Sequence, residues 1–213
     1  MNPVFITGGT GYIGGPLIGA LLERGYVVTA LVRAASAHKL PRGAGAVIGD
    51  ALEASTFANA IPPNATFVHL VGTPHPNPAK AAEFQRVDLA SIKAAVLAAR
   101  QAGVRHFVYV SVAHPAPVMR EYIAVRQQGE SLVRASGIAA TILTPWYVLG
   151  PGHRWPYVLL PVYAILRRLP ATRQGAERLG LLTRSTMIAA LVRAIEAPPT
   201  GGVRILEVPD IRR

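Results

Sequence analysis

The glycine-rich stretch TGGTGYIGG, residues 7–15, constrains the fold of this chain more than any other feature. It follows an apolar run and precedes a segment with apolar residues at helical spacing. Gly8, Gly11 and Gly14 form the pattern G-x-x-G-x-x-G between a predicted strand and a predicted helix. Such glycines allow a tight turn, close approach of the backbone to a pyrophosphate, and close packing of helix on strand. The stretch therefore predicts a dinucleotide-binding turn, although glycine clusters also occur in ordinary turns.

Short apolar runs then alternate with longer segments of helical spacing, and Gly or Pro stands at most joins, which is the rhythm of βαβ units. We expect strands over 3–7, 26–32, 46–48, 66–71, 107–111, 140–143 and 203–208. Helices are expected over 11–24, 53–60, 79–102, 119–135 and 183–196. The later strands are apolar along their length, as in parallel sheets covered on both faces. The expected fold is an α/β, doubly wound, mostly parallel sheet (a Rossmann fold), with ligands at the carboxyl ends of the strands.

The length and composition indicate one folded unit. A chain of 213 residues with 51% hydrophobic and 15% charged residues can build a substantial core, so intrinsic disorder is excluded as an overall description. We expect a single domain over 1–213. The rhythm breaks within 145–182, which holds five of the eighteen prolines. This part is expected to be a loop and helix elaboration that forms the substrate side.

The charge balance is basic, with 22 Lys and Arg against 11 Asp and Glu, and nineteen of the cations are Arg. These residues are scattered and not interleaved with aromatic residues, so no nucleic-acid partner is expected, whereas an anionic cofactor suits the charge. The chain has no Cys, and its six His show no i, i+4 pair, so no metal site is expected. A basic segment followed by an apolar signal is not visible at the start, and a cytoplasmic location is the default expectation.

An apolar run over 155–166 is flanked by Arg154, Arg167 and Arg168. Twelve residues are too few to span a bilayer, for which about 20 are needed. The run is interpreted either as a buried lid or interface helix, or as a peripheral membrane or protein-partner contact through 154–168.

Several motifs follow one another in the order found in a known group of proteins. They are TGGTGYIG at the start, LVR at 31–33, GD at 49–50, AGVRHFVYVS at 102–111, LVRASGI at 132–138 and PWYVLGPG at 145–152. Together they resemble the atypical short-chain dehydrogenase/reductases of the NAD-dependent epimerase/dehydratase superfamily. This branch includes NmrA-like proteins and the Rossmann-type accessory subunit of respiratory complex I. The resemblance covers residues 3–152 well and the carboxyl third loosely.

The resemblance implies a set of cofactor-binding residues. The pyrophosphate would be wrapped by Gly8, Thr10, Gly11, Tyr12, Ile13 and Gly14, with further contacts from Val71, Gly72, Pro145 and Val148. NAD-preferring relatives carry an acidic residue at the end of the second strand, whereas this chain has Arg33. An Arg can pair with a 2′-phosphate, so NADP(H) is favoured over NAD(H), unless Arg33 is merely a solvated cation. Asp50 is similar to the family's adenine-contacting acid; it could equally cap a helix before Glu53.

The resemblance also implies a catalytic set, with one departure. Family enzymes use a Tyr and, four residues later, a Lys; here Tyr122 is followed by Arg126. This spacing places both side chains on one helix face, and Arg is a permanent cation, but its planar fork differs from a Lys head group. The pair could equally be an ordinary pair on a helix surface. Ser111 resembles the family's substrate-orienting serine, and Val112 replaces a second serine.

Two functions remain open. The first is an NADP(H)-dependent oxidoreductase that acts on an unknown carbonyl or quinone-like small molecule, with Tyr122 as proton donor and Ser111 orienting the substrate. The second is a dinucleotide-binding protein without catalysis, either a redox sensor or a structural or assembly subunit.

Overall fold

The computed structural model describes residues 3–151, 174–175 and 177–213. Its centre is a parallel sheet of seven strands in the order β3-β2-β1-β4-β5-β6-β9. The strands are β1 (Val4–Thr7), β2 (Val28–Val32), β3 (Gly45–Ile48), β4 (Thr66–His69), β5 (His106–Val110), β6 (Ala140–Thr144) and β9 (Val203–Glu207). A doubly wound, Rossmann-like α/β fold is thereby confirmed.

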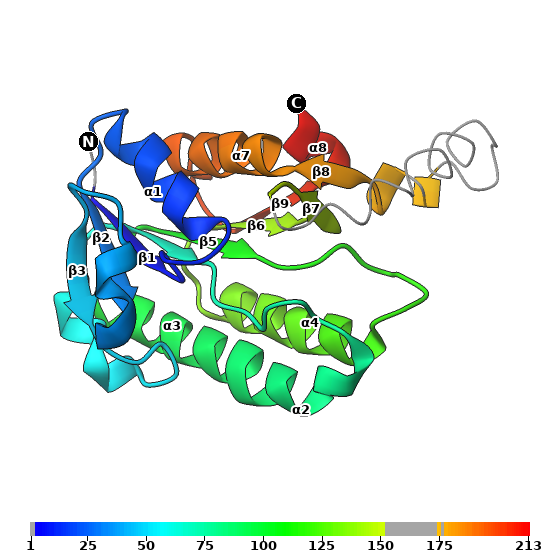
Figure 1. Ribbon diagram of the computed structural model, residues 1–213, viewed down its shortest axis with the longest axis horizontal. Helices are drawn as coiled ribbons and strands as arrows, with labels where there is room; N and C mark the ends of the chain where they lie inside the picture. Colours follow the sequence, from blue (N-terminus) through cyan, green and yellow to red (C-terminus); the bar gives the residue numbers. More distant parts are fainter. Residues whose placement is uncertain (1–2, 152–173, 176) are drawn as a thin grey trace.

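Helices cover both faces of the sheet, so the fold has three layers (Figure 1). One face carries α1 (Gly14–Leu22), α7 (Arg184–Glu196) and α8 (Val208–Arg212); the other carries α2 (Ala81–Glu83), α3 (Ala90–Gln101) and α4 (Arg120–Ala135). The strand order reverses between β1 and β4, which is where this class of fold opens a crevice for ligands.

Adjacent residues of the central strands enter opposite cores, which explains why these strands are apolar throughout. Phe5, Phe67 and Phe107 are in register on β1, β4 and β5. Their ring centroids lie 5.4 and 5.1 Å apart in the core beneath α3 and α4. The next residue of each strand, such as Ile6 or Val68, packs into the second core with α1 and α7. A sheet buried on both faces has no solvent side on which polar residues could alternate.

The predicted strands and long helices are present, with ends shifted by up to three residues. Two predicted helices differ in kind. The segment 53–60 forms two short 3₁₀ turns, Ala54–Thr56 and Ala58–Ala60. Here the Thr56 hydroxyl donates to the backbone carbonyls of Asp50 and Glu53, which holds a turn in place of a longer helix.

The predicted helix over 79–102 is divided into four parts. It begins with a 3₁₀ turn (Pro78–Lys80) capped by Asn77 and continues as α2, a π-helical turn (Phe84–Leu89) and α3. A π turn inserts extra backbone into a helix and often lies at functional sites. Here it carries the buried residue Asp88.

The part beyond β6 holds elements that the sequence did not predict. Strands β7 (Tyr147–Leu149) and β8 (Leu181–Thr183) pair in parallel and form a second, small sheet. The apolar run 155–166 and the proposed contact segment 154–168 lie outside the described residues. Within the described ranges, no helix is long and apolar enough to cross a membrane.

Candidate functional site

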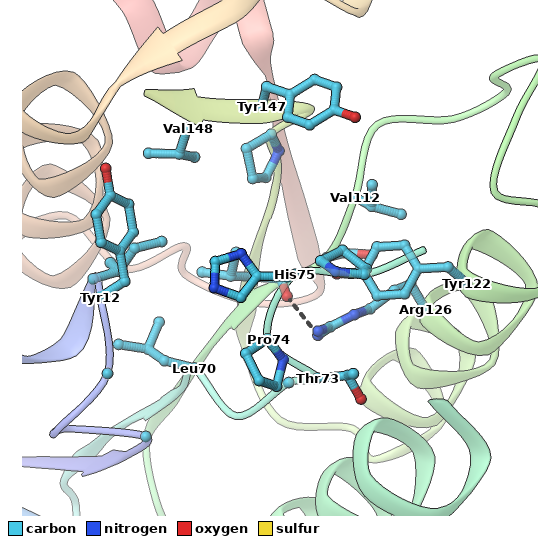
Figure 2. Close-up of a pocket in the computed structure, with 18 of the residues that line it drawn as sticks. Tyr12, Leu70, Thr73, Pro74, His75, Val112, Tyr122, Arg126, Tyr147 and Val148 are labelled. Atoms are coloured by element: carbon cyan, nitrogen blue, oxygen red, sulfur yellow. Dashed lines mark hydrogen bonds between the residues drawn. The ribbon is translucent and has the colours of Figure 1, made fainter. Parts of the chain in front are cut away.

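A cavity of about 450 Å³ lies at the carboxyl ends of β1, β4, β5 and β6. The chain that leaves each of these strands lines it, as do Met119 directly before α4 and Tyr122 and Arg126 on α4. Figure 2 shows the last two. Tyr12 and Leu70 lie on one side of the cavity, Tyr122 and Arg126 on the other, with His75 between them. The cavity therefore joins the glycine-rich turn to the predicted catalytic residues.

The glycine-rich turn has no room for side chains at two positions. Gly8 has a φ of 80°, and a Cβ there would lie 2.8 Å from the backbone carbon of Leu70. A Cβ on Gly14 would overlap the carbonyl oxygen of Gly8. These contacts bring the turn against β4 and place the start of α1 beside the cavity.

The N-terminus of α1 suits an anion. Tyr12, Ile13 and Gly14 line the cavity at this point. No side chain caps the helix at Ile13, and the first turn of α1 contains no acidic residue. The positive end of the helix dipole favours a phosphate group here.

Arg126 is held by a buried carboxylate. Its Nη2 atom lies 2.6 Å from Oδ1 of Asp88, and its Nη1 atom donates to the carbonyl of Val110 at 3.1 Å (Figure 2). The other Asp88 oxygen accepts from the backbone N–H and hydroxyl of Thr73, at 3.0 and 2.6 Å. The guanidinium passes so close to Gly72 that a Cβ there would overlap Nη2. Arg126 thus ties α4 to the loop after β4.

The charge of Arg126 persists in this buried place. Burial disfavours the charged form, but the oxygens of Tyr122, Tyr109 and Asp88 more than offset it, so the pKa of Arg126 is raised. Its Cζ atom lies 5.1 Å from the ring centroid of Tyr122 and 5.9 Å from that of Tyr109. Burial also raises the pKa of Tyr109, although the nearby guanidinium opposes this. Tyr109 is therefore a neutral phenol.

Tyr122 and Arg126 do not form an exposed pair on a helix surface. Arg126 is 6% exposed, and the Tyr122 ring packs against Phe84 with their centroids 5.0 Å apart. Both residues line the cavity. The spacing of four residues does place them on one face of α4, and that face is turned inward.

Ser111 also lines the cavity, but its proton points elsewhere. Its hydroxyl donates to Oε1 of Glu130 at 2.6 Å, and both residues are buried. His114 approaches the same carboxylate, with Nε2 at 3.2 and 3.4 Å from its two oxygens. Ser111 is therefore part of a polar chain that leads away from the cavity.

Four predicted cofactor residues lie outside the cavity lining: Thr10, Arg33, Asp50 and Val71. Arg33 is exposed directly after β2, at the start of the 3₁₀ segment Ala34–Lys39. Asp50 accepts a hydrogen bond from the backbone N–H of Leu52 at 2.9 Å, as in an Asx turn, and does not cap a longer helix. Of the other predicted cofactor residues, Gly72, Pro145 and Val148 line the cavity.

Sequence analysis missed Asp88 and Glu130. Glu130 stands four residues after Arg126, so helical spacing could have placed it on the same inward face. Asp88 lies four residues from both Phe84 and Ile92, so the same spacing could have placed it on the apolar face of the expected helix. In the described part of the chain, no cluster of three His, Asp or Glu side chains could hold a metal ion.

Comparison with known proteins agrees with this geometry. Residues 8–157 match a family described as NAD(P)H-binding. Among solved structures, MoeE5 in complex with UDP-glucuronic acid and NAD has a TM-score of 0.71 at 22% identity, covering 97% of this chain and 76% of that one. The Bordetella bronchiseptica enzyme WbmH in complex with NAD⁺ also gives 0.71, at 21% identity over 97% and 75%. These likenesses support the fold.

Three curated relatives are reductases by name. Ceramide reductase of Caulobacter vibrioides is 30% identical over 212 residues, 99% of this chain and 65% of that protein. The 3-diazoavenalumate denitrifying reductase of a Streptomyces species is 30% identical over 231 residues, 96% and 75%. A 4-hydroxy-2-methyl-3-oxo-4-farnesyl-3,4-dihydroquinoline-1-oxide ketoreductase of Stigmatella aurantiaca is 28% identical over 168 residues, 68% and 50%. This chain thus spans just under two thirds of the ceramide reductase and half of the ketoreductase.

The family model covers most of the chain, and the relatives cover nearly all of it. The resemblance to the short-chain dehydrogenase/reductase and epimerase superfamily is confirmed by these matches and by the fold. The chain belongs to the family of NAD(P)H-binding proteins.

Proposed function

We propose that this protein is an NADP(H)-dependent reductase of an apolar carbonyl or quinone-like compound. The observation that carries the proposal is the single cavity that joins the glycine-rich turn to Tyr122 and Ser111. The names of the three curated relatives, all reductases, also support it.

The cofactor would supply a hydride to the substrate. The start of α1, with Gly11, Tyr12 and Ile13 at the cavity wall, would hold its pyrophosphate. The residues therefore fit a dinucleotide at the turn.

The preference for NADP(H) rests on charge after β2. Residues 33–49, which follow β2, contain three Lys or Arg and no Asp or Glu. The 3₁₀ segment after Arg33 ends beside Leu40, whose Cδ2 would lie 3.6 Å from a Cβ on Gly9. This contact sets the basic segment next to the glycine-rich turn, where a 2′-phosphate could pair with Arg33.

Tyr122 would donate the proton to the substrate oxygen. Its ring is fixed between Phe84 and the guanidinium of Arg126, which limits its rotation. Asp88 and Val110 hold the two terminal nitrogens of Arg126, so the role of this cation would be to position Tyr122 and the loop after β4.

The described walls of the substrate side are apolar. Val112, Met119, Trp146 and Tyr147 line it, and the rings of the last two meet edge to face. Burial raises the pKa of Tyr147, so it is a neutral phenol. Two relatives are named for a ceramide and a farnesyl-bearing quinoline, both of which carry long hydrocarbon groups. A hydrophobic carbonyl compound fits this wall better than a sugar nucleotide does.

The cofactor preference is tested by titrating the protein with NADPH and with NADH and measuring the quenching of its fluorescence. Wild-type protein should bind NADPH more tightly than NADH. Arg33→Ala should weaken NADPH binding by about tenfold to a hundredfold, because a charge-assisted hydrogen bond contributes about 1.5–3 kcal/mol, and leave NADH almost unchanged. Arg24→Ala is the matched control, since Arg24 pairs with Glu196 on α7. Equal affinity for the two cofactors would contradict the preference.

Measuring NADPH oxidation tests the proposed reduction and the role of Tyr122 in it. NADPH oxidation should be measured with long-chain aldehydes, aromatic ketones and quinones, and Tyr122→Phe should lower the rate by about a hundredfold or more. Turnover that is unchanged in this variant would remove Tyr122 from the mechanism.

A second function, dinucleotide binding without catalysis, is favoured by one observation. Arg126 replaces the Lys of family enzymes, and each of its two terminal nitrogens has an acceptor, Val110 for Nη1 and Asp88 for Nη2. This alternative predicts tight NADPH binding with no oxidation of NADPH by any compound in the panel. Turnover of even one compound, lost in Tyr122→Phe, would exclude it.

A further inference from the structure

A continuous hydrogen-bonded chain leads from the cavity towards solvent. Ser111 donates to Glu130 at 2.6 Å, the Glu130 carboxylate lies 3.2 Å from Nε2 of His114, and the amide of Gln127 lies 3.3 Å from Nδ1 of His114. Ser111 lines the cavity, whereas the His114 side chain is 27% exposed. The chain thus crosses the wall of the cavity through a carboxylate that is 8% exposed.

The contacts of His114 define which nitrogen carries its proton. A Gln amide nitrogen can only donate, so Nδ1 of His114 accepts from Gln127. The proton of the neutral imidazole then lies on Nε2 and is donated to Glu130. The links from His114 through Glu130 to Ser111 are therefore donor–acceptor pairs that can pass a proton, whereas the Gln127 amide only holds the imidazole in place.

Among the contacts of the described residues, the partners of the Glu130 carboxylate are members of this chain. From the loop after β5 it meets Ser111 and His114. On α4, Arg126 lies one turn earlier, but its guanidinium is bound to Asp88 of the π turn and to the carbonyl of Val110. Neither of these contacts competes for the Glu130 oxygens.

The direction of the Ser111 hydroxyl matters for reduction. Its only proton is given to Glu130, so in this arrangement Ser111 offers the cavity a lone pair and cannot donate to a carbonyl oxygen. A proton placed on Glu130 would reverse this bond. Glu130 would then donate to Ser111, and the proton of Ser111 would be free to turn into the cavity.

We propose that His114 and Glu130 form a proton path that carries one proton from solvent to Ser111 for each carbonyl reduced. In this step the Nε2–H bond of His114 breaks and an O–H bond forms on Glu130. Glu130 passes its proton to Ser111 as Ser111 gives its own to the oxygen it faces, either the reduced substrate oxygen or the Tyr122 oxygen. As the Nε2 proton leaves, the exposed Gln127 side chain swings away from Nδ1, and His114 takes a proton from solvent there, so that the imidazole stays neutral. The ring then turns over and brings its N–H back to Glu130. No electrons move along the path, and the hydride comes from the cofactor.

The path rests on the proposed reductase function, so its test combines a measurement without substrate with a kinetic one. Nitrogen-15 NMR of uniformly labelled protein near neutral pH, with His114 assigned by difference from His114→Gln, should show the tautomer protonated at Nε2. The Nδ1-protonated tautomer would overturn the path, whatever the enzyme does.

Menadione with NADPH is the kinetic probe. His114→Gln keeps a donor to Glu130 but cannot relay a proton, so turnover should fall about tenfold or more. His114→Ala should regain turnover when imidazole is added, and the solvent isotope effect on turnover should rise in both variants. Arg134→Gln, an exposed change one turn after Glu130 on α4, should behave as wild type. NADPH affinity should be the same in all four proteins.

The outcomes separate the two claims. If His114→Gln is as active as wild type while His114→Ala is not, His114 has a structural role and the path is wrong. If wild-type protein binds NADPH but reduces neither menadione nor the wider panel, the reductase function fails, and the path through these residues fails with it as a catalytic device. Loss of turnover in His114→Gln with rescue of His114→Ala by imidazole supports both.

Discussion

Removing the carboxylate of Asp88 should destabilise this protein strongly. Asp88 is 1% exposed and accepts three hydrogen bonds, from Arg126 and from the backbone and hydroxyl of Thr73. Asp88→Ala leaves the Arg126 guanidinium, which is 7% exposed, without its counter-ion. It also removes the acceptor from both Thr73 donors. The change therefore creates an uncompensated buried charge and unpaired donors in one place.

The magnitude follows from the class of interaction. Breaking a buried ion pair by removing one partner costs about 3–5 kcal/mol. In a chain of this length, each kcal/mol corresponds to about 2–4 °C of Tm, so Tm should fall by about 6–20 °C. An exposed pair costs far less: Arg24 and Glu196 lie 3.8 Å apart with side chains 48% and 46% exposed, and Glu196→Ala should cost less than about 1 kcal/mol.

Urea unfolding and calorimetry of three variants measure this difference. The third is the double variant Asp88→Leu with Arg126→Met, which replaces both charges with apolar groups and should recover most of the loss in Asp88→Ala. An unfolding free energy that falls by no more in Asp88→Ala than in Glu196→Ala would refute the reasoning. So would a double variant that is no more stable than Asp88→Ala, because removing the unpaired charge would then recover nothing.

Two glycine substitutions should change the stability in opposite directions, and two buried histidines should make the stability depend on pH. Gly72→Ala should destabilise the protein by about 1–3 kcal/mol, because the new Cβ meets the guanidinium of Arg126. Gly19→Ala in α1 should stabilise it by about 0.5–1 kcal/mol, because the new Cβ meets no neighbouring atom within 4 Å. Urea unfolding should therefore give changes of opposite sign for the two variants. Burial, aided by the charge of Arg126, lowers the pKa of His69 from 6.5 to about 3, and burial and nearby arginines lower that of His106 to about 4. The unfolded chain therefore binds protons that the folded one does not, and the free energy of unfolding should fall between pH 6.5 and 4, by up to about 1.4 kcal/mol per pH unit for each histidine. His69→Gln should reduce that slope, and an unchanged slope would exclude His69 as a source.

The sheet could be predicted because its signal is local. Each central strand is a short apolar run bounded by Gly, Pro or a polar residue, and its two faces both need apolar side chains. Phe5 and Ile6 show the rule, since they enter opposite cores. The glycine-rich turn could also be predicted from the sequence. A side chain at Gly8 or Gly14 would collide with the backbone, so these positions require glycine, and the glycine pattern is visible in the sequence.

The π turn could not be predicted from local signals. Residues 79–102 have helical spacing and high helix propensity, and nothing within them indicates an inserted residue. Asp88, in this turn, lies in the core, and its partners Thr73 and Arg126 are 15 and 38 residues away in sequence. A bond of this kind appears only when α3, α4 and the loop after β4 have assembled.

The substitution of Arg for Lys at position 126 therefore has to be interpreted together with Asp88. A lone Arg on an inward helix face would be a buried charge with several unsatisfied donors, and the sequence offers no reason for it. With Asp88 and Val110 in place, two of its nitrogens have acceptors, and Gly72 leaves room for the fork to pass. These two contacts hold the guanidinium in place beside Tyr122. Of the two groups proposed to deliver a proton to the substrate, Tyr122 and Ser111, it is Ser111 that is joined to a chain leading towards solvent, through Glu130 and His114, among the contacts of the described residues.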